Sequence, residues 1–150
     1  MSLLDDLYRE TILAHYDHPR HRGKIEDPTA TIEGVNPLCG DELTLYLRVK
    51  DGTVEDVKIE AKGCSISMAS GSMMAEAVQG QPITQAEHVV GLFKQMMLDK
   101  NKEVDLPEEL EELEALQGVK KYPVRIKCAT LPWHALKAAL AGESQKVSTE

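Results

Sequence analysis

The sequence lacks the features of three common classes of protein. Its 17 Lys and Arg residues are outnumbered by 25 Asp and Glu residues, giving a net charge of −8, and it has no basic block or stripe. This disfavours nucleic acid as a partner, because phosphate backbones attract clustered basic side chains. No apolar run approaches the roughly 20 residues of a membrane helix, and the N-terminus lacks the layout of a signal peptide. We therefore expect a cytoplasmic protein with no membrane segment.

Cysteine is also scarce. The three cysteines, Cys39, Cys64 and Cys128, are odd in number and spread over most of the chain, so a disulfide framework explains them poorly. In a reducing compartment three interpretations remain: buried inert thiols, a reactive thiol, or a metal site assembled from distant segments.

The 150 residues, 42% of them hydrophobic, can form one domain with its own core. No repeat or linker divides the chain, so we expect a single domain over residues 1–150. In the first half of the chain the patterns predict a helix over 3–16, a loop over 21–28, an extended run over 30–36, and a hairpin of strands over 42–49 and 56–61. A helix is then expected after Cys64, and a second helix is opened by a capping box at Thr84. The last third is predicted to hold a short helix from Asp105 to Gly118, an extended run over 122–127, a helix over 131–140 and a disordered tail over 142–150.

This order favours an α+β domain with helices packed on one face of an antiparallel sheet. The hairpin is the strongest signal, since apolar and polar residues alternate on both sides of Asp51-Gly52. Residues 99–117 hold eight acidic residues and two lysines, a net charge of −6. We interpret this segment as a solvated surface helix, with a docking face for a basic partner as the alternative.

The three cysteines are predicted at similar places. Cys39 lies in a turn before a strand, and Cys64 and Cys128 are expected at strand-to-helix junctions, where the helix dipole favours a thiolate. Zinc prefers four ligands, so three cysteines need one more. Asp41 is the leading candidate, because Gly40 permits a tight turn that brings it beside Cys39. Separate buried thiols remain the alternative at this point.

The histidines are a competing source of ligands. His15, His18 and His21 recur every third residue, but Pro19 breaks the helix between the last two, and neighbouring arginines disfavour a cation. We interpret the remaining two, His88 and His134, as surface or packing residues.

Three short motifs, each containing one of the cysteines, resemble those of a known protein family. The segments Asn36–Asp41, Gly63–Ser70 and Val124–Ala129 resemble, in order, the ligand-bearing motifs of the IscU/SufU (NifU N-terminal-like) family, and the likeness extends over nearly the whole chain. At two features the chain differs from IscU-type scaffolds and resembles the SufU branch of the family. Lys127 stands where those scaffolds have a histidine, and extra sequence separates Cys64 from Cys128.

The resemblance implies a three-stranded antiparallel sheet with helices on one face, and zinc on Cys39, Asp41, Cys64 and Cys128. It also implies a zinc-dependent sulfurtransferase that accepts persulfide sulfur from a SufS-type cysteine desulfurase and serves downstream iron–sulfur assembly proteins. A desulfurase histidine would replace Cys39 on zinc, and the freed thiolate would attack the persulfide.

Two other functions stay open. The first is a scaffold for assembly and transfer of a [2Fe–2S] cluster, with Asp41 as a labile ligand. The second is a zinc-stabilised interaction module with no sulfur chemistry. Arg125 and Lys127 flank the expected site, either as exposed strand residues or as side chains that face the partner or stabilise an anionic persulfide.

Overall fold

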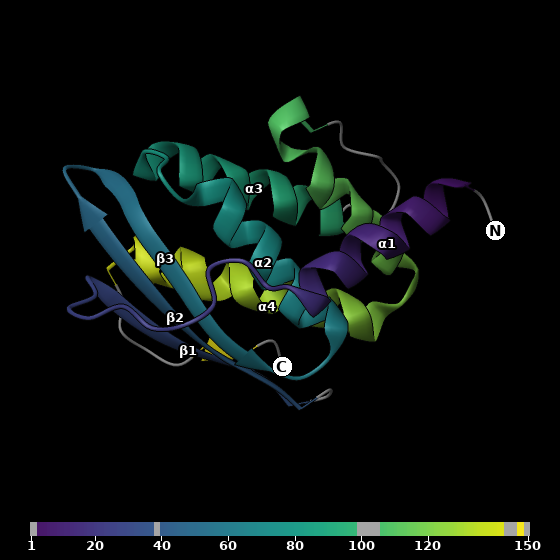
Figure 1. Cartoon of the computed structure of the whole chain (residues 1–150), viewed down its shortest axis with the longest axis horizontal. Helices are drawn as coiled ribbons and strands as arrows, with labels where there is room; N and C mark the ends of the chain where they lie inside the picture. Colours follow the sequence, from purple (N-terminus) through teal and green to yellow (C-terminus); the bar gives the residue numbers. More distant parts are fainter. Residues whose placement is uncertain (1–2, 38–39, 99–105, 143–146, 149–150) are drawn as a thin grey trace.

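The computed structural model describes residues 3–37, 40–98, 106–142 and 147–148. Its elements follow the chain as α1 (Leu3–Asp17), β1 (Ala30–Asn36), β2 (Asp41–Lys50), β3 (Thr53–Lys62), α2 (Ser65–Val78), α3 (Ile83–Leu98), the 3₁₀ helix η1 (Glu108–Lys121), α4 (Pro123–Leu140) and β4 (Val147–Ser148). Figure 1 shows the sheet on one side of the molecule and the helices on the other. None of the helices in the described part of the chain is long and apolar enough to cross a membrane.

The sheet confirms the predicted α+β class. Strands β1, β2 and β3 are antiparallel neighbours, and the two-residue β4 pairs in parallel with β1, within the tail expected to be disordered. Residues 143–146 and 149–150 of that tail lie outside the described residues. Strands β2 and β3 are joined by a turn at Asp51 (φ 53°) and Gly52 (φ 74°). Positive φ at both positions is typical of a type I′ hairpin. The predicted hairpin is therefore confirmed.

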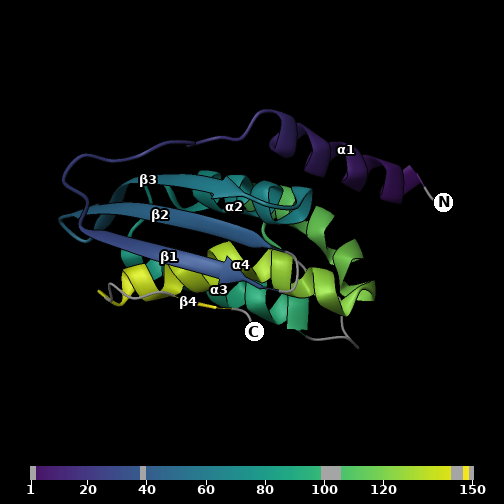
Figure 2. The same cartoon turned by 90° about the horizontal axis from the view of Figure 1, so that it is seen from below.

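One face of the sheet is apolar and packs on the helices (Figure 2). Ile32 of β1, Leu45 of β2 and Ile59 of β3 lie side by side in the register and are buried. The segment between α1 and β1 runs along the outer edge of β3, where Gly23 donates to the Ile59 carbonyl at 3.1 Å and Ile59 donates to the His21 carbonyl at 3.0 Å. These bonds cover part of an edge that would otherwise expose unpaired backbone groups.

The helical layer is centred on two aromatic rings. Phe93 of α3 stacks on Trp133 of α4 with ring centroids 4.2 Å apart, and both side chains are fully buried. The Trp133 indole N–H donates to Ser70 Oγ of α2 at 2.9 Å, and the Ser70 hydroxyl donates to the Ala129 carbonyl at 2.6 Å. The polar group of the tryptophan is therefore satisfied inside the core, as burial requires.

The predicted extended run over 122–127 is wrong, because α4 begins at Pro123. Arg125 and Ile126 both donate backbone hydrogen bonds to the Tyr122 carbonyl, as in a first helical turn. Proline is favourable at the first position of a helix, where its missing N–H costs nothing. The helix then continues through Pro132, although an internal proline usually ends one.

Two further elements differ from the prediction in their boundaries. η1 extends past Gly118 to Lys121, and its buried Leu110, Leu113 and Leu116 recur at the three-residue period of a 3₁₀ helix rather than at the α-helical period. α3 begins at Ile83, so Thr84 lies inside its first turn and not at its cap. Residues 99–105 of the acidic segment lie outside the described residues.

Candidate metal centre

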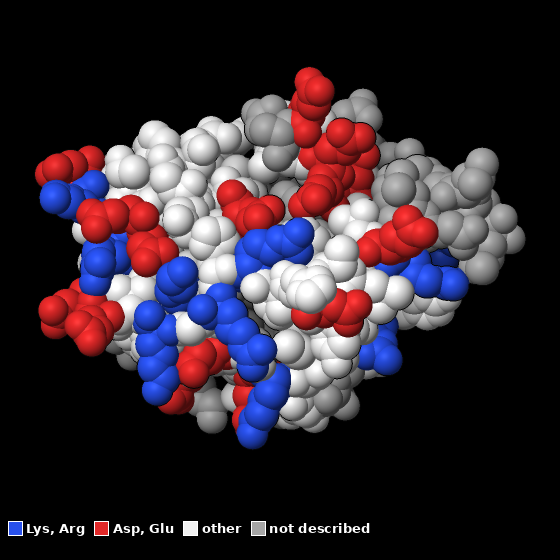
Figure 3. Space-filling view, in the orientation of Figure 1, with Lys and Arg blue, Asp and Glu red and all other residues white. Residues whose placement is uncertain are grey.

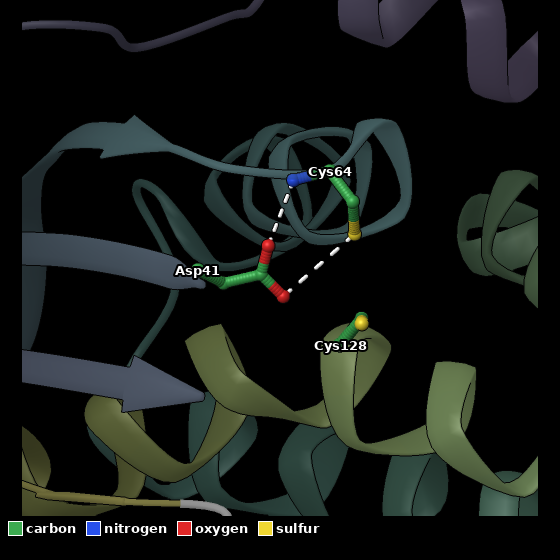
Figure 4. A group of neighbouring side chains, drawn as sticks. All are labelled: Asp41, Cys64 and Cys128. Atoms are coloured by element: carbon green, nitrogen blue, oxygen red, sulfur yellow. Dashed lines mark hydrogen bonds between the residues drawn. The ribbon is translucent and has the colours of Figure 1, made fainter. Parts of the chain in front are cut away.

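Three side chains from three elements meet beyond the end of the sheet. Asp41 opens β2, Cys64 precedes α2, and Cys128 lies in α4. One ligand atom from each lies within 4.8 Å of the other two, and Figure 4 shows the carboxylate and both sulfur atoms pointing into the same space. Cys64 and Cys128 are free thiols. The fourth residue of the expected set, Cys39, lies outside the described residues.

The Asp41 carboxylate is only 1% exposed, and hydrogen bonds hold it in place. Its Oδ1 accepts from the Cys64 backbone N–H at 2.7 Å, and its Oδ2 lies 3.7 Å from Cys64 Sγ. Gly40, immediately before it, has φ +70°, a conformation that glycine adopts without strain. A carboxylate and two thiols that converge on one point are ligands of divalent metals, so this group is suited to binding a cation.

The Cys64 thiol sits at the N-cap of α2, as the sequence predicted. Its Sγ accepts from the Ser67 backbone N–H at 3.5 Å, the bond that a capping Ser or Asp oxygen usually makes. The positive end of the helix dipole at this position stabilises negative charge on sulfur.

The position of Cys128 corrects the prediction. It lies within α4, after Pro123 and Val124, rather than at a strand-to-helix junction, because the expected strand is helical. Its side chain is fully buried, and its Sγ lies 3.7 Å from the Val124 carbonyl of the preceding turn. The thiol therefore reaches the cluster from the side of α4, and not from the N-terminus of its own helix.

Asn36, at the end of β1, links two members of the cluster, a role that the sequence did not predict. Its Nδ2 donates to Asp41 Oδ2 at 3.2 Å and to Cys128 Sγ at 3.3 Å, and the residue is fully buried. Its Oδ1 has no hydrogen-bond partner among the described residues. Its place as the first residue of the motif ending at Asp41 was the only signal in the sequence.

Arg125 supplies positive charge at the edge of the cluster. Its pKa is raised above the ordinary value, first by the charge of Cys64 and then by a hydrogen bond with Cys128. The side chain is exposed, whereas Lys127 is half-buried, and both lie on α4 rather than on a strand. Solvent and a partner can therefore reach the guanidinium while it faces both thiols.

The histidines do not enter this cluster in the described structure. His18 and His88 are exposed, His21 is half-buried in the loop beside β3, and His15 is buried in a separate group. His134 is half-buried on α4, where burial and then the charges of Lys94 and Lys137 lower its pKa.

The fold and this cluster define a small α+β protein with a carboxylate–thiol centre at the end of its sheet. The sequence profile of the NifU-like N terminal domain matches residues 7–129. The chain belongs to this family, which confirms the resemblance seen in the three motifs.

Relatives with established descriptions cover nearly the whole chain. It is 46% identical over 140 residues to the zinc-dependent sulfurtransferase SufU of Bacillus subtilis (strain 168), covering 93% of both chains. It is 39% identical over 134 residues to the iron–sulfur cluster assembly scaffold protein IscU of Thermotoga maritima, covering 89% of this chain and 92% of the relative. The crystal structure of FiSufU from Fervidobacterium islandicum AW-1 aligns with a TM-score of 0.79 at 36% identity, over 87% of this chain and 94% of that one.

Proposed function

We propose that the chain is a cytoplasmic, zinc-dependent sulfurtransferase that accepts persulfide sulfur from a SufS-type cysteine desulfurase for iron–sulfur cluster assembly. The observation that carries this proposal is the convergence of Asp41, Cys64 and Cys128 within 4.8 Å, with Cys39 only two residues from Asp41. The similarity to a relative described as a zinc-dependent sulfurtransferase supports it over most of the chain.

The donor set fits zinc. Two thiols and one carboxylate are three of the groups that bind this metal, and Cys39 would complete a set of four. Bound zinc would keep the thiols deprotonated near neutral pH and join three distant segments of the chain. Asn36 would orient Asp41 and Cys128 from behind, as the partners of metal ligands commonly do.

Cys39 is proposed as the sulfur acceptor. Its thiolate would attack the outer sulfur of the desulfurase persulfide, so that a new sulfur–sulfur bond forms to Cys39 while the donor's own sulfur–sulfur bond breaks. The desulfurase cysteine leaves as a thiolate, and Cys39 becomes the persulfide, so the exchange needs no outside oxidant or reductant. Downstream iron–sulfur assembly proteins would then receive this sulfur.

Arg125 and Lys127 are proposed to face the partner. The exposed Arg125 guanidinium already interacts with both described thiols, and a persulfide arriving at this edge brings negative charge. A fixed guanidinium would attract and orient it. Lys127, two residues further along α4, is the second basic residue proposed to contact the partner.

A second candidate function is a scaffold for a [2Fe–2S] cluster. Thiolates are the usual ligands of such clusters, and an aspartate in the set would bind iron less firmly and ease transfer. The relative described as the IscU scaffold favours this alternative. Lys127, in place of the histidine of IscU-type scaffolds, supports the sulfurtransferase instead.

The test combines metal analysis with desulfurase kinetics. The purified protein is expected to hold about one zinc per chain, to lack visible colour, and to increase desulfurase turnover. Cys39→Ala should remain folded and abolish the increase, whereas the control Ser65→Ala, beside the site, should keep it. Iron with sulfide and a brown chromophore would favour the scaffold, and full stimulation by Cys39→Ala would refute Cys39 as the acceptor.

A further inference from the structure

A second group of metal-ligating side chains lies apart from the cysteines, between three helices. His15 comes from α1, Glu76 from α2 and Glu112 from η1, and one ligand atom of each lies within 4.8 Å of the other two. His15 Nε2 and Glu112 Oε2 are 2.8 Å apart. The imidazole is 1% exposed, while the side chains of Glu112 and Glu76 are 60% and 43% exposed. The group therefore has a buried nitrogen at its base and two carboxylates at its opening.

The His15 ring is fixed by contacts on its other nitrogen. Nδ1 lies 2.8 Å from the hydroxyl of Ser72, and that hydroxyl also accepts the Arg20 backbone N–H at 2.8 Å. Ser72 is itself buried. Histidines that bind metals are usually oriented in this way, by a hydrogen bond from the nitrogen that does not face the ion.

The neutral His15 ring has two tautomers, and they differ in whether the His15–Glu112 pair needs a cation. If the Ser72 hydroxyl donates to Nδ1, then Nε2–H donates to Glu112 and the pair is complete without a cation. If Ser72 accepts from Nδ1–H, as it accepts from Arg20, the Nε2 lone pair faces a carboxylate oxygen. Two acceptors at 2.8 Å repel each other unless a cation, a proton or a metal ion, binds both.

The geometry fits a metal ion as that cation. In an octahedral site with bonds of about 2.1 Å, neighbouring ligand atoms are about 3.0 Å apart, close to the observed Nε2–Oε2 separation. Glu76 supplies a third ligand, and its other oxygen can stay near Arg20 Nε, which lies 3.6 Å from Oε1. That guanidinium offsets one of the two carboxylate charges and orients Glu76.

We propose that His15, Glu76 and Glu112 form a binding site for a divalent first-row cation of the Mn²⁺ and Fe²⁺ class, with water completing the coordination. One imidazole and two carboxylates, open to solvent, suit these ions, whereas thiolates are the softer ligands that zinc favours. Of the three spaced histidines that the sequence disfavoured as a metal site, only His15 takes part, and His18 and His21 lie outside the group. A bound ion would join α1, α2 and η1, and so hold the acidic η1 against the core.

The first test is a titration of the zinc-loaded protein with Mn²⁺, followed by the loss of the electron paramagnetic resonance signal of the free ion. Mn²⁺ binds protein ligands more weakly than zinc does, so it leaves the thiolate centre filled. We expect one Mn²⁺ per chain, and we expect Glu76→Gln and Glu112→Gln each to weaken binding at least about tenfold. These side chains are exposed, so neither change should prevent folding.

The control is Glu111→Gln, which removes a neighbouring exposed carboxylate of η1 and should leave Mn²⁺ affinity nearly unchanged. Equal weakening by Glu111→Gln and Glu112→Gln would mean that the acidic surface attracts cations without a defined site. Absence of stoichiometric binding would mean that His15 and Glu112 form only a hydrogen-bonded pair. Either result overturns the proposal and leaves the thiolate centre unaffected.

Discussion

Gly63 lies so close to Asp41 that a Cβ on Gly63 would stand 2.2 Å from the Asp41 carboxylate oxygen Oδ1 and 2.8 Å from its Cα. Gly63 also has φ +140°, a conformation that residues with a side chain rarely adopt. We expect Gly63→Ala to displace Asp41 and weaken zinc binding by at least about tenfold, although all four proposed ligands remain. Competition with a chromophoric chelator would measure the change.

The control for this substitution is Gly52→Ala. Gly52 has φ +74°, but its added Cβ would meet nothing within 4 Å. The change should therefore destabilise the hairpin by about 1 kcal/mol through backbone strain, with no effect on zinc affinity. Equal zinc affinity in Gly63→Ala and the unmodified protein would show that the position of Asp41 does not control metal binding.

Much of the fold followed from sequence periodicity, because one-sided burial repeats with the geometry of each element. The hairpin around Asp51-Gly52 and the helix after Cys64 are confirmed. The extended run predicted over 122–127 is wrong, because Pro123 marks a helix start although β-branched Val124 and Ile126 favour a strand. Tertiary packing of α4 on the sheet overrides the local preference of Val124 and Ile126 for a strand.

The sequence predicted that Asp41, Cys64 and Cys128 lie together, but not the contacts that hold them, and their binding of zinc stays a prediction. Asp41, Cys64 and Cys128 come together as expected, whereas the double hydrogen bond of Asn36 and the close approach of Gly63 were not foreseen. These two contacts depend on how the end of β1 and the start of α2 meet in space. Spacing along the chain holds no information about that distance.

Metal removal should lower stability strongly. The proposed zinc site joins segments as far apart as β2 and α4, and structural zinc contributes on the order of 10 kcal/mol in small zinc modules. A strong chelator should therefore lower the melting temperature, as measured by circular dichroism. The matched control is Asp41→Ala, in which the site is already incomplete and the chelator should have a much smaller effect. A chelator that leaves the melting temperature of the unmodified protein unchanged would contradict a metal bound across these segments.

Ser70→Ala should destabilise the core without touching the metal centre. The Ser70 hydroxyl accepts from the Trp133 indole N–H and donates to the Ala129 carbonyl, with every group buried. Its loss leaves the indole N–H unpaired in the core, at a cost of about 1–3 kcal/mol. Urea unfolding followed by the fluorescence of Trp133, the only tryptophan of the chain, would measure this.

The control for Ser70→Ala is Thr84→Ala, which removes an exposed hydroxyl on α3 and should change stability by less than about 0.5 kcal/mol. Zinc content should be the same in both variants. Equal urea midpoints for Ser70→Ala and Thr84→Ala would show that the bond to the indole contributes nothing to stability.

The pH dependence of stability should depend in part on His134. In the folded protein burial, then Lys94 and Lys137, lower its pKa below the ordinary 6.5, so the unfolded chain binds a proton that the folded one resists. The stability that neutral, buried His134 gives the folded protein is fully present above about pH 6.5 and is lost as the pH falls from there through the lowered pKa. His134→Gln should therefore lose less stability than the unmodified protein between about pH 7.5 and 5.5, measured by urea unfolding at both values.

His21, whose pKa is also lowered by burial, will retain part of the pH dependence in this variant. The control His88→Gln, at an exposed position, should behave as the unmodified protein does. Parallel losses in His134→Gln and the unmodified protein would show that protonation of His134 does not oppose the fold.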